Sequence, residues 1–182
     1  ASSVSTVTGS ASDVTASYVS SGITGLGNEA VTLEGTTAAA SDLNAVNAAT
    51  SVNVDASSIT TLTGQLSSVV AAILSSGVTG LGNEVVILSD ESLSVSAVNA
   101  LNALTSGNVD TTYIATLTGS AFDVLSLFGA TGIIGLGGQS VTLDDATLAA
   151  TALSAVDGVT TGVVNASSVL TVTGSASAVA ST

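Results

Sequence analysis

The sequence predicts an α/β fold: a right-handed solenoid with a parallel sheet on one side and helices on the other. Three observations predict it, namely a 55-residue repeat, short β-branched segments in each half-repeat, and helical apolar spacing between these segments. A crossover between parallel strands is right-handed in nearly all proteins, so repeating it without reversal stacks coils into a solenoid.

A Thr-Gly pair defines the repeat. Its glycine recurs with successive differences of 55, at Gly9, Gly64, Gly119 and Gly174. A Gly-Leu-Gly turn recurs in the same register at 25–27, 80–82 and 135–137. We therefore expect residues 1–182 to be a single solenoid segment cut from a longer array, with repeats at approximately 2–56, 57–111 and 112–166 and a partial one at 167–182.

Each repeat contains two related strand segments. An apolar residue stands two places before a Gly or Asp, with spacings that alternate between 26 and 29, at Val7, Leu33, Leu62, Leu88, Leu117, Leu143 and Val172. The residue three places earlier is mostly β-branched, as strands prefer. This predicts seven parallel strands in one sheet, with coil lengths that alternate in the same way. The apolar residues of the return loops, Ile23 and Leu26 or Val54 and Val109, favour a second short strand per coil.

The segments between the strands have helical spacing. One helix face is predicted by each of four sets: Leu66, Val69, Val70 and Ile73; Ala121, Val124, Leu125 and Phe128; Leu93, Ala97, Leu101 and Leu104; and Leu148, Ala152, Val156 and Val159. With seven strands, this pattern predicts six intervening helices.

The predicted helices also carry end signals. Ser10 with Asp13 and Ser120 with Asp123 have the spacing of a capping box. Acidic residues are expected beside the positive end of a helix dipole at Asp90, Glu91, Asp144 and Asp145. Glycines expected to form left-handed C-terminal caps follow the helices at Gly22, Gly77, Gly107, Gly132 and Gly162.

The composition excludes several functions. The chain has no Lys, Arg, His, Cys, Met, Trp or Pro, and its net charge is -13. Such a charge repels nucleic acid and anionic lipid, and no apolar run approaches the ~20 residues of a membrane span. Without an imidazole, amine or thiol, Ser and Thr have no side chain to activate them. We predict no enzyme activity and no catalytic residue.

Candidate binding motifs favour structural roles. The Gly-Leu-Gly segments lead from a helix towards a strand, opposite to a dinucleotide loop, and are predicted to be tight turns. Asp55, Asp110 and Asn165 are predicted to form Asx turns, because the glycine-rich spacing of a Ca²⁺ ladder is missing. No cofactor-binding or metal-binding residue is therefore assigned, and hard oxygen ligands leave Ca²⁺ as the one alternative.

Threonine pairs on four strands suggest a further alternative. Residues at alternate strand positions share a face, here Thr6 and Thr8, Thr61 and Thr63, Thr116 and Thr118, and Thr171 and Thr173. Such an array could bind ice or glycan. The intervening strands interrupt it with pairs such as Thr32 with Glu34, which favours ordinary solvent-facing residues.

The repeats resemble those of a known class of protein. Gly-Ile-Thr-Gly-Leu-Gly-Asn-Glu at 22–29, Val-Thr-Leu at 31–33 and Asn-Val-Asp-Ala-Ser-Ser at 53–58 are similar to repeats of very long surface or secreted proteins of marine cyanobacteria. The resemblance covers the whole chain and implies an extracellular or cell-surface structural array. We expect a stalk, spacer or surface-layer element, with a glycan- or ice-binding module or a Ca²⁺-stabilised adhesin segment as alternatives. Neighbouring repeats are the expected partners, with end-to-end self-association through apolar ends.

Overall fold

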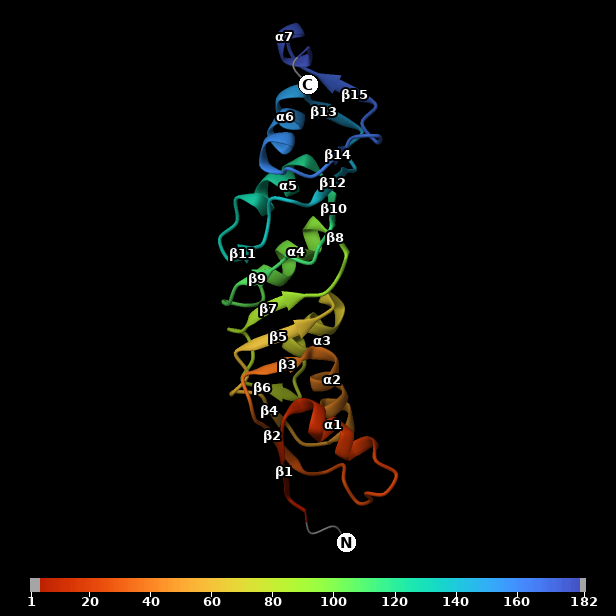
Figure 1. Cartoon of the computed structure of the whole chain (residues 1–182), viewed down its shortest axis with the longest axis vertical. Helices are drawn as coiled ribbons and strands as arrows, with labels where there is room; N and C mark the ends of the chain where they lie inside the picture. The colour runs from red at the N-terminus through yellow and green to blue at the C-terminus, as the bar shows by residue number, and fades with distance from the viewer. Residues whose placement is uncertain (1–3, 181–182) are drawn as a thin grey trace. The chain divides into compact units, whose positions relative to one another are not determined.

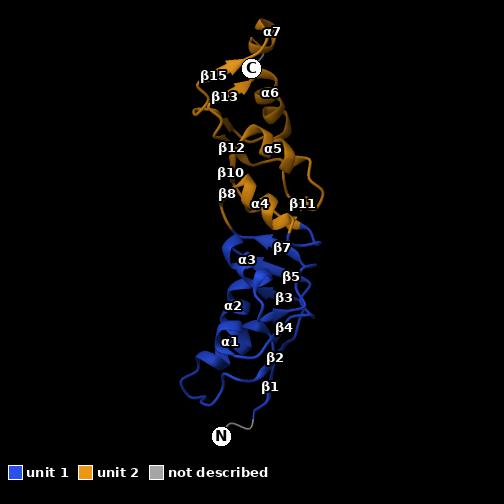
Figure 2. Ribbon diagram, turned by 180° about the vertical axis from the view of Figure 1, so that it is seen from behind, with its two compact units in different colours: residues 1–89, 104–108 blue, residues 90–103, 109–182 orange. Residues whose placement is uncertain are grey.

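A computed structural model of the chain describes residues 4–180 (Figure 1). It is an α/β protein with seven helices in the described range, and every strand pairing in that range is parallel. The chain divides into two compact units (Figure 2). Unit 1 contains residues 1–89 and Leu104–Asn108, and unit 2 contains Asp90–Ala103 and Val109–Thr182.

Unit 1 alternates short strands with helices of nine or ten residues. Its helices are α1 (Ala11–Val19), α2 (Ala40–Ala49) and α3 (Leu66–Leu74). Its strands are β1 (Thr6–Gly9), β2 (Ala30–Leu33), β3 (Thr37–Ala39), β4 (Val54–Asp55), β5 (Thr61–Gly64), β6 (Val78–Thr79) and β7 (Val85–Leu88). The strands pair in the orders β1-β2-β4-β6 and β3-β5-β7, and α2 packs between α1 and α3.

Unit 2 is built in the same manner. Its helices are α4 (Val95–Asn102), α5 (Ala121–Phe128), α6 (Ala150–Val159) and α7 (Ala176–Val179). Its strands are β8 (Ser92–Ser94), β9 (Val109–Asp110), β10 (Thr116–Gly119), β11 (Ile133–Ile134), β12 (Ser140–Leu143), β13 (Thr147–Ala149), β14 (Val164–Asn165) and β15 (Thr171–Thr173). Pairing follows the orders β8-β10-β12-β14, β9-β11 and β13-β15.

The seven predicted strands are confirmed, but they do not share one sheet. In unit 1, β2 and β5 were expected to be neighbours, yet β2 pairs with β1 and β4, whereas β5 pairs with β3 and β7. The cause is the pairing register. Thr6 pairs with Ala30 and Thr61 pairs with Val85, so the register offset is 30 minus 6 or 85 minus 61, which is 24 in both cases. Because the motif spacing of 26 or 29 exceeds the register offset, consecutive predicted strands do not stay in register, and β2 and β5 lie in different sheets.

With this register, β8 and β13 are strands where the sequence pattern predicted parts of helices. Leu93 and Leu148, assigned to helices, lie instead in β8 and β13, so α4 and α6 begin at Val95 and Ala150. The second short strands predicted at Val54 and Val109 are confirmed as β4 and β9, whereas no strand forms at Ile23 or Leu26.

The core of each unit consists of aliphatic side chains from strands and helices. On α5 the buried row is Ala121, Val124 and Leu127, so Leu127 takes the place expected for Leu125 and Phe128. Unit 1 buries Leu33, Leu43, Leu62, Val69 and Leu88, and unit 2 buries Val98, Leu101, Leu117, Val141 and Leu143. These side chains supply the apolar burial that holds each unit together.

The helix starts predicted from the two capping boxes are confirmed, with altered chemistry. The Ser10 hydroxyl accepts the Asp13 backbone N–H at 3.2 Å and donates to the Asp13 carboxylate at 2.7 Å. Ser120 and Asp123 repeat the arrangement at 3.1 and 2.8 Å. Because aspartate is one methylene shorter than the glutamate of a usual capping box, its carboxylate accepts the hydrogen bond of the capping hydroxyl.

The predicted glycine caps are wrong. Of the five glycines only Gly132 has a positive φ, 91°, but α5 ends at the C-cap Gly129, which has a φ of -92°, while α1, α2, α3 and α6 end in extended residues. The glycines other than Gly22 instead lie where another segment of the chain approaches closely. A methyl group on Gly107 would collide with the Glu84 carbonyl group, and one on Gly77 would meet the Asn47 side chain.

Candidate functional site

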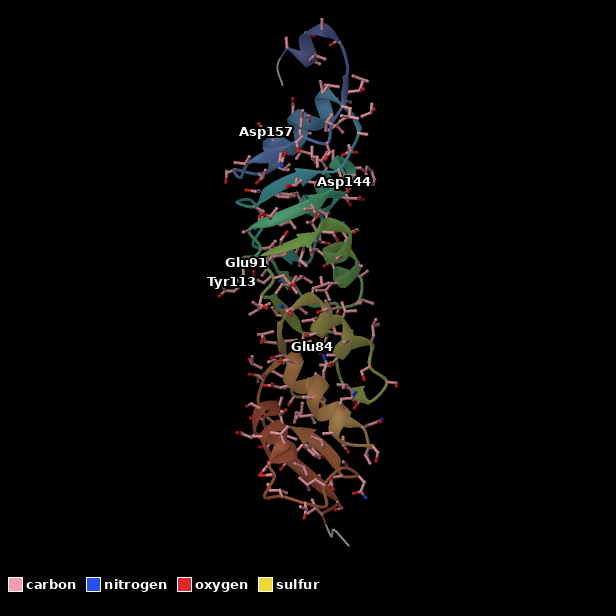
Figure 3. All side chains as sticks on the ribbon, turned by 90° about the vertical axis from the view of Figure 1, so that its right-hand side faces the viewer. Glu84, Glu91, Tyr113, Asp144 and Asp157 are labelled. Carbon is pink, nitrogen blue, oxygen red and sulfur yellow. The ribbon has the colours of Figure 1, made fainter. Side chains whose placement is uncertain are left out.

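Three polar side chains are buried at corresponding places. Glu29 and Glu84 are 0% exposed and Gln139 is 4% exposed. Their positions differ by the repeat length, since 84 minus 29 and 139 minus 84 both equal 55. Each stands directly before a strand, β2, β7 or β12, and shortly after a Gly-Leu-Gly turn. Figure 3 labels Glu84. We call these three residues the turn-binding side chains.

Each turn-binding side chain folds back onto the turn that precedes it. Glu29 Oε2 accepts the Gly27 N–H at 2.6 Å, and Glu84 Oε2 accepts the Gly82 N–H at 2.8 Å. Gln139 Oε1 accepts the Gly137 N–H at 2.9 Å. These glycine N–H groups are partly buried, and the turn-binding side chains supply the hydrogen-bond partner that each of them needs.

A buried threonine secures the backbone of each turn-binding residue. The Oγ1 atoms of Thr50, Thr105 and Thr160 donate to the carbonyl oxygens of Glu29, Glu84 and Gln139 at 2.6, 3.2 and 2.6 Å. The same hydroxyl oxygens of Thr105 and Thr160 accept the N–H groups of Gly107 and Gly162 at 3.0 Å. Two of the predicted cap glycines therefore help to form this polar cluster.

Glu29 has the most donors of the three. Its Oε2 also accepts the Asn28 N–H at 3.1 Å and the Tyr18 hydroxyl at 3.2 Å. The Gly27 N–H is the largest influence and lowers the pKa of Glu29, against the opposing effect of burial.

Acid should therefore weaken unit 1 through Glu29. A lowered folded-state pKa adds stability above the ordinary glutamate value of about 4.3 and loses it as the pH falls through the folded value. We expect wild type to lose more stability than Glu29→Gln between about pH 5 and pH 3. Urea unfolding across this range measures the difference, and the other carboxylates are common to both proteins. Parallel pH profiles would contradict the assignment.

Sequence reasoning did not select the turn-binding side chains, because a Glu after Gly-Leu-Gly-Asn resembles a solvent-exposed turn residue. The available signal was positional: Glu29, Glu84 and Gln139 keep one hydrogen-bonding side chain of constant length at one place in the repeat.

The residues predicted to form Asx turns do so. Asp55 Oδ1 accepts the Ser57 N–H at 3.0 Å, Asp110 Oδ1 accepts the Thr112 N–H at 2.9 Å, and Asn165 Oδ1 accepts the Ser167 N–H at 3.0 Å. The Ser57 hydroxyl and N–H lower the pKa of Asp55. The Gly-Leu-Gly segments are tight turns as predicted, with φ of 88° at Gly80 and 81° at Gly135.

The acidic pairs lie elsewhere than expected. Strands β8 and β13 separate Asp90 with Glu91 and Asp144 with Asp145 from the helices that follow. Asp145 Oδ2 instead accepts the Ala121 N–H at 2.7 Å, so it caps the start of the earlier helix α5. Over residues 4–180, no three or more His, Cys, Asp or Glu side chains gather as a metal site would require.

The threonine pairs lie on strand faces that are partly exposed. In unit 2, Thr118 lies between Ser94 and Thr142 in register, and Thr116 lies between Ser92 and Ser140. In unit 1, Thr63 instead has Ala39 and Ile87 as its neighbours. The hydroxyl rows are therefore short in unit 2, and apolar residues break the row in unit 1.

No family model, curated protein or solved structure matches the chain. Within the part of the chain that the structure describes, no helix combines the length and the apolar character of a membrane span.

Proposed function

We propose that this chain is a structural segment of a large extracellular or cell-surface protein, a solenoid that acts as a stalk, spacer or surface-layer element. The observation that carries the proposal is the reuse of one set of structural contacts at equivalent places along the chain. Thr50, Thr105 and Thr160 each bond the carbonyl of a turn-binding residue, and the turn-binding side chains close equivalent turns. Repetition of this kind builds length, because each coil is stabilised by its neighbours.

The polar groups that resemble sites support the same proposal. Asp55 and Asp110 close Asx turns, Asp123 and Asp145 serve helix starts, and Glu29 closes a glycine turn. Each has a local hydrogen-bonding role that accounts for its position. A repeated surface of this type does not readily form one singular pocket, so we propose no enzyme activity.

Antibodies against the chain test the proposed location. We expect them to label intact cells of the source organism along extended surface or secreted structures in immunogold microscopy. Labelling that appears only after the cells are permeabilised would contradict the proposal. Preimmune serum is the control.

Self-association is proposed to occur through the last strand-helix coil. Val172 is 38% exposed, whereas Leu117, at the corresponding place in the repeat, is 0% exposed. Burial of such a surface is favourable at about 25 cal/mol per Å², so another coil of the same type is a suitable cover.

We expect the average mass in sedimentation equilibrium to rise with protein concentration. Val172→Glu should reduce this rise, because it places a charge in the proposed contact, while Leu74→Glu adds the same charge at an exposed residue of α3 as a control. A mass that stays monomeric for all three proteins at high concentration would contradict the contact.

The Ca²⁺-stabilised and ice- or glycan-binding alternatives have direct assays. A Ca²⁺ ion held only by the folded state raises the melting temperature by mass action, and the structural proposal expects no such rise. Thermal hysteresis would favour ice binding, and retention on a glycan array would favour sugar binding.

A further inference from the structure

Strands β1 and β15 occupy the same place in the repeat, and each has one free edge. Their first residues differ by 171 minus 6, which is 165 or three repeats of 55. Within the described residues β1 pairs only with β2, and β15 pairs only with β13. The equivalent strand β5 pairs on both sides, with β3 and β7, and β10 does so with β8 and β12. Strand β1 therefore lacks the strand before it, and β15 lacks the strand after it.

The two free edges carry complementary backbone groups. Where an earlier strand is present, the first residue of the strand donates its N–H to the residue that precedes the earlier strand, at 2.9, 3.0 and 3.1 Å for Thr61, Thr116 and Thr171. Thr6 supplies this N–H on β1. Where a later strand is present, its first N–H is accepted at 3.1, 2.9 and 2.9 Å by the carbonyl oxygens of Ser5, Thr60 and Ala115. Leu170 supplies this carbonyl on β15. Such an edge can bind another strand.

The side chains of β1 match those of the strand that β15 lacks. In each complete pair the later strand places a valine opposite the apolar residue of the earlier one, with Val31 opposite Val7, Val86 opposite Leu62 and Val141 opposite Leu117. Val172 is the next residue in this series, and it is 38% exposed. The Thr-Val-Thr of β1 is similar to the Ala-Val-Thr of β2 and the Ser-Val-Thr of β12. Strand β1 of a second copy therefore offers the missing valine, Val7.

The charges at the two edges also permit the contact. The chain carries a net charge of -13, but residues 158–182, which include β15 and α7, contain no Asp or Glu. Over β1 and α1 the sequence has one acidic residue, Asp13, and its carboxylate accepts the Ser10 hydroxyl at 2.7 Å. Like-charge repulsion, which disfavours most contacts between acidic surfaces, is therefore small here.

We infer that β15 of one copy pairs in parallel with β1 of a second copy, so that copies associate head to tail. In this register the Thr6 N–H donates to the Leu170 carbonyl oxygen, and Val172 lies opposite Val7. A two-fold contact between two β15 strands would be antiparallel, whereas every strand pairing in the described range is parallel. The inference rests on the self-association proposed above and names the surface that receives β15, but it does not depend on the proposed extracellular location.

Two variants that block opposite ends test the direction of the contact. Thr8 lies two residues after Thr6 and directs its N–H to the same edge, so Thr8→Pro removes a donor from the free edge of β1. Val172→Glu places a charge on β15. Each variant alone should keep the mass of one chain in sedimentation equilibrium, at concentrations where wild type associates. An equimolar mixture should reach the mass of two chains and no more, because each variant keeps the end that the other has lost.

The outcomes separate this inference from the proposed self-association. If Thr8→Pro alone associates as strongly as wild type, or if the mixture stays at the mass of one chain, the pairing with β1 is wrong, although β15 can still be a contact surface. If wild type itself stays monomeric, both proposals are wrong. Circular dichroism of each variant checks that it is folded.

Cross-linking tests the same contact with both backbones intact. Thr8→Cys and Thr173→Cys are placed in separate copies, since both residues are exposed and the chain has no native cysteine. A short bifunctional thiol reagent should link a Thr8→Cys copy to a Thr173→Cys copy faster than it links two Thr173→Cys copies. Equal rates, or faster linking of the two Thr173→Cys copies, would overturn the head-to-tail arrangement.

Discussion

Replacing Leu117 with Ala should destabilise unit 2 by about 2 to 5 kcal/mol, which is a large part of the stability of a small domain. Leu117 is 0% exposed on β10, and its register partners Leu93 and Val141 lie on both neighbouring strands. Truncation removes apolar burial and leaves a cavity that strands fixed by backbone hydrogen bonds cannot close. Urea unfolding followed by circular dichroism measures the change.

Leu170→Ala is the matched control, because the same side chain is 84% exposed there. Its effect should stay within about 0.5 kcal/mol. Equal losses for the two variants would show that Leu117 does not occupy a closed core.

Replacing Gly80 with Ala should destabilise unit 1 through both backbone strain and a steric clash. Gly80 has a φ of 88°, and a methyl group there would lie 2.7 Å from the Ser57 backbone nitrogen. Backbone strain contributes about 1 to 2 kcal/mol. The clash adds about 1 to 3 kcal/mol, since the Ser57 backbone must move.

Gly35→Ala separates the two contributions. Gly35 has a φ of 89°, and a methyl group there would have no heavy atom within 4 Å. The free energy of unfolding of the Gly35→Ala protein should fall by the backbone strain alone, without a contribution from a clash. If Gly35→Ala costs as much as Gly80→Ala in the same urea titration, the close approach of the Ser57 backbone to Gly80 is wrong.

Local patterns predicted the elements better than their pairing. The apolar residue before each Gly or Asp identified seven strands, and Ser10 and Ser120 identified helix starts, because these signals act within a few residues. Leu93 and Leu148 were assigned to helices since their spacing to Leu101 and Val156 is helical. They lie in strands because the later segments β10 and β15 pair with them.

The burial of the glutamates could not be predicted from local sequence patterns, for a similar reason. Glu84 is charged in isolation and follows a glycine turn, which favours solvent exposure. Its burial depends on Thr105 and Gly107, which lie far along the sequence and bond or contact its backbone. The recurrence of an equivalent side chain at Gln139 was the only sequence signal for this site.

The register offset of 24 is the central structural claim, and paired cysteines test it most directly. The chain has no native cysteine, so Thr118→Cys with Thr142→Cys and Thr118→Cys with Asp144→Cys can be compared without background. Thr118 and Thr142 are register partners on β10 and β12, whereas Asp144 would face Thr118 if the motif spacing of 26 set the pairing. A short bifunctional thiol reagent should link 118 with 142 faster than 118 with 144. The reverse order would contradict the register and the fold built on it.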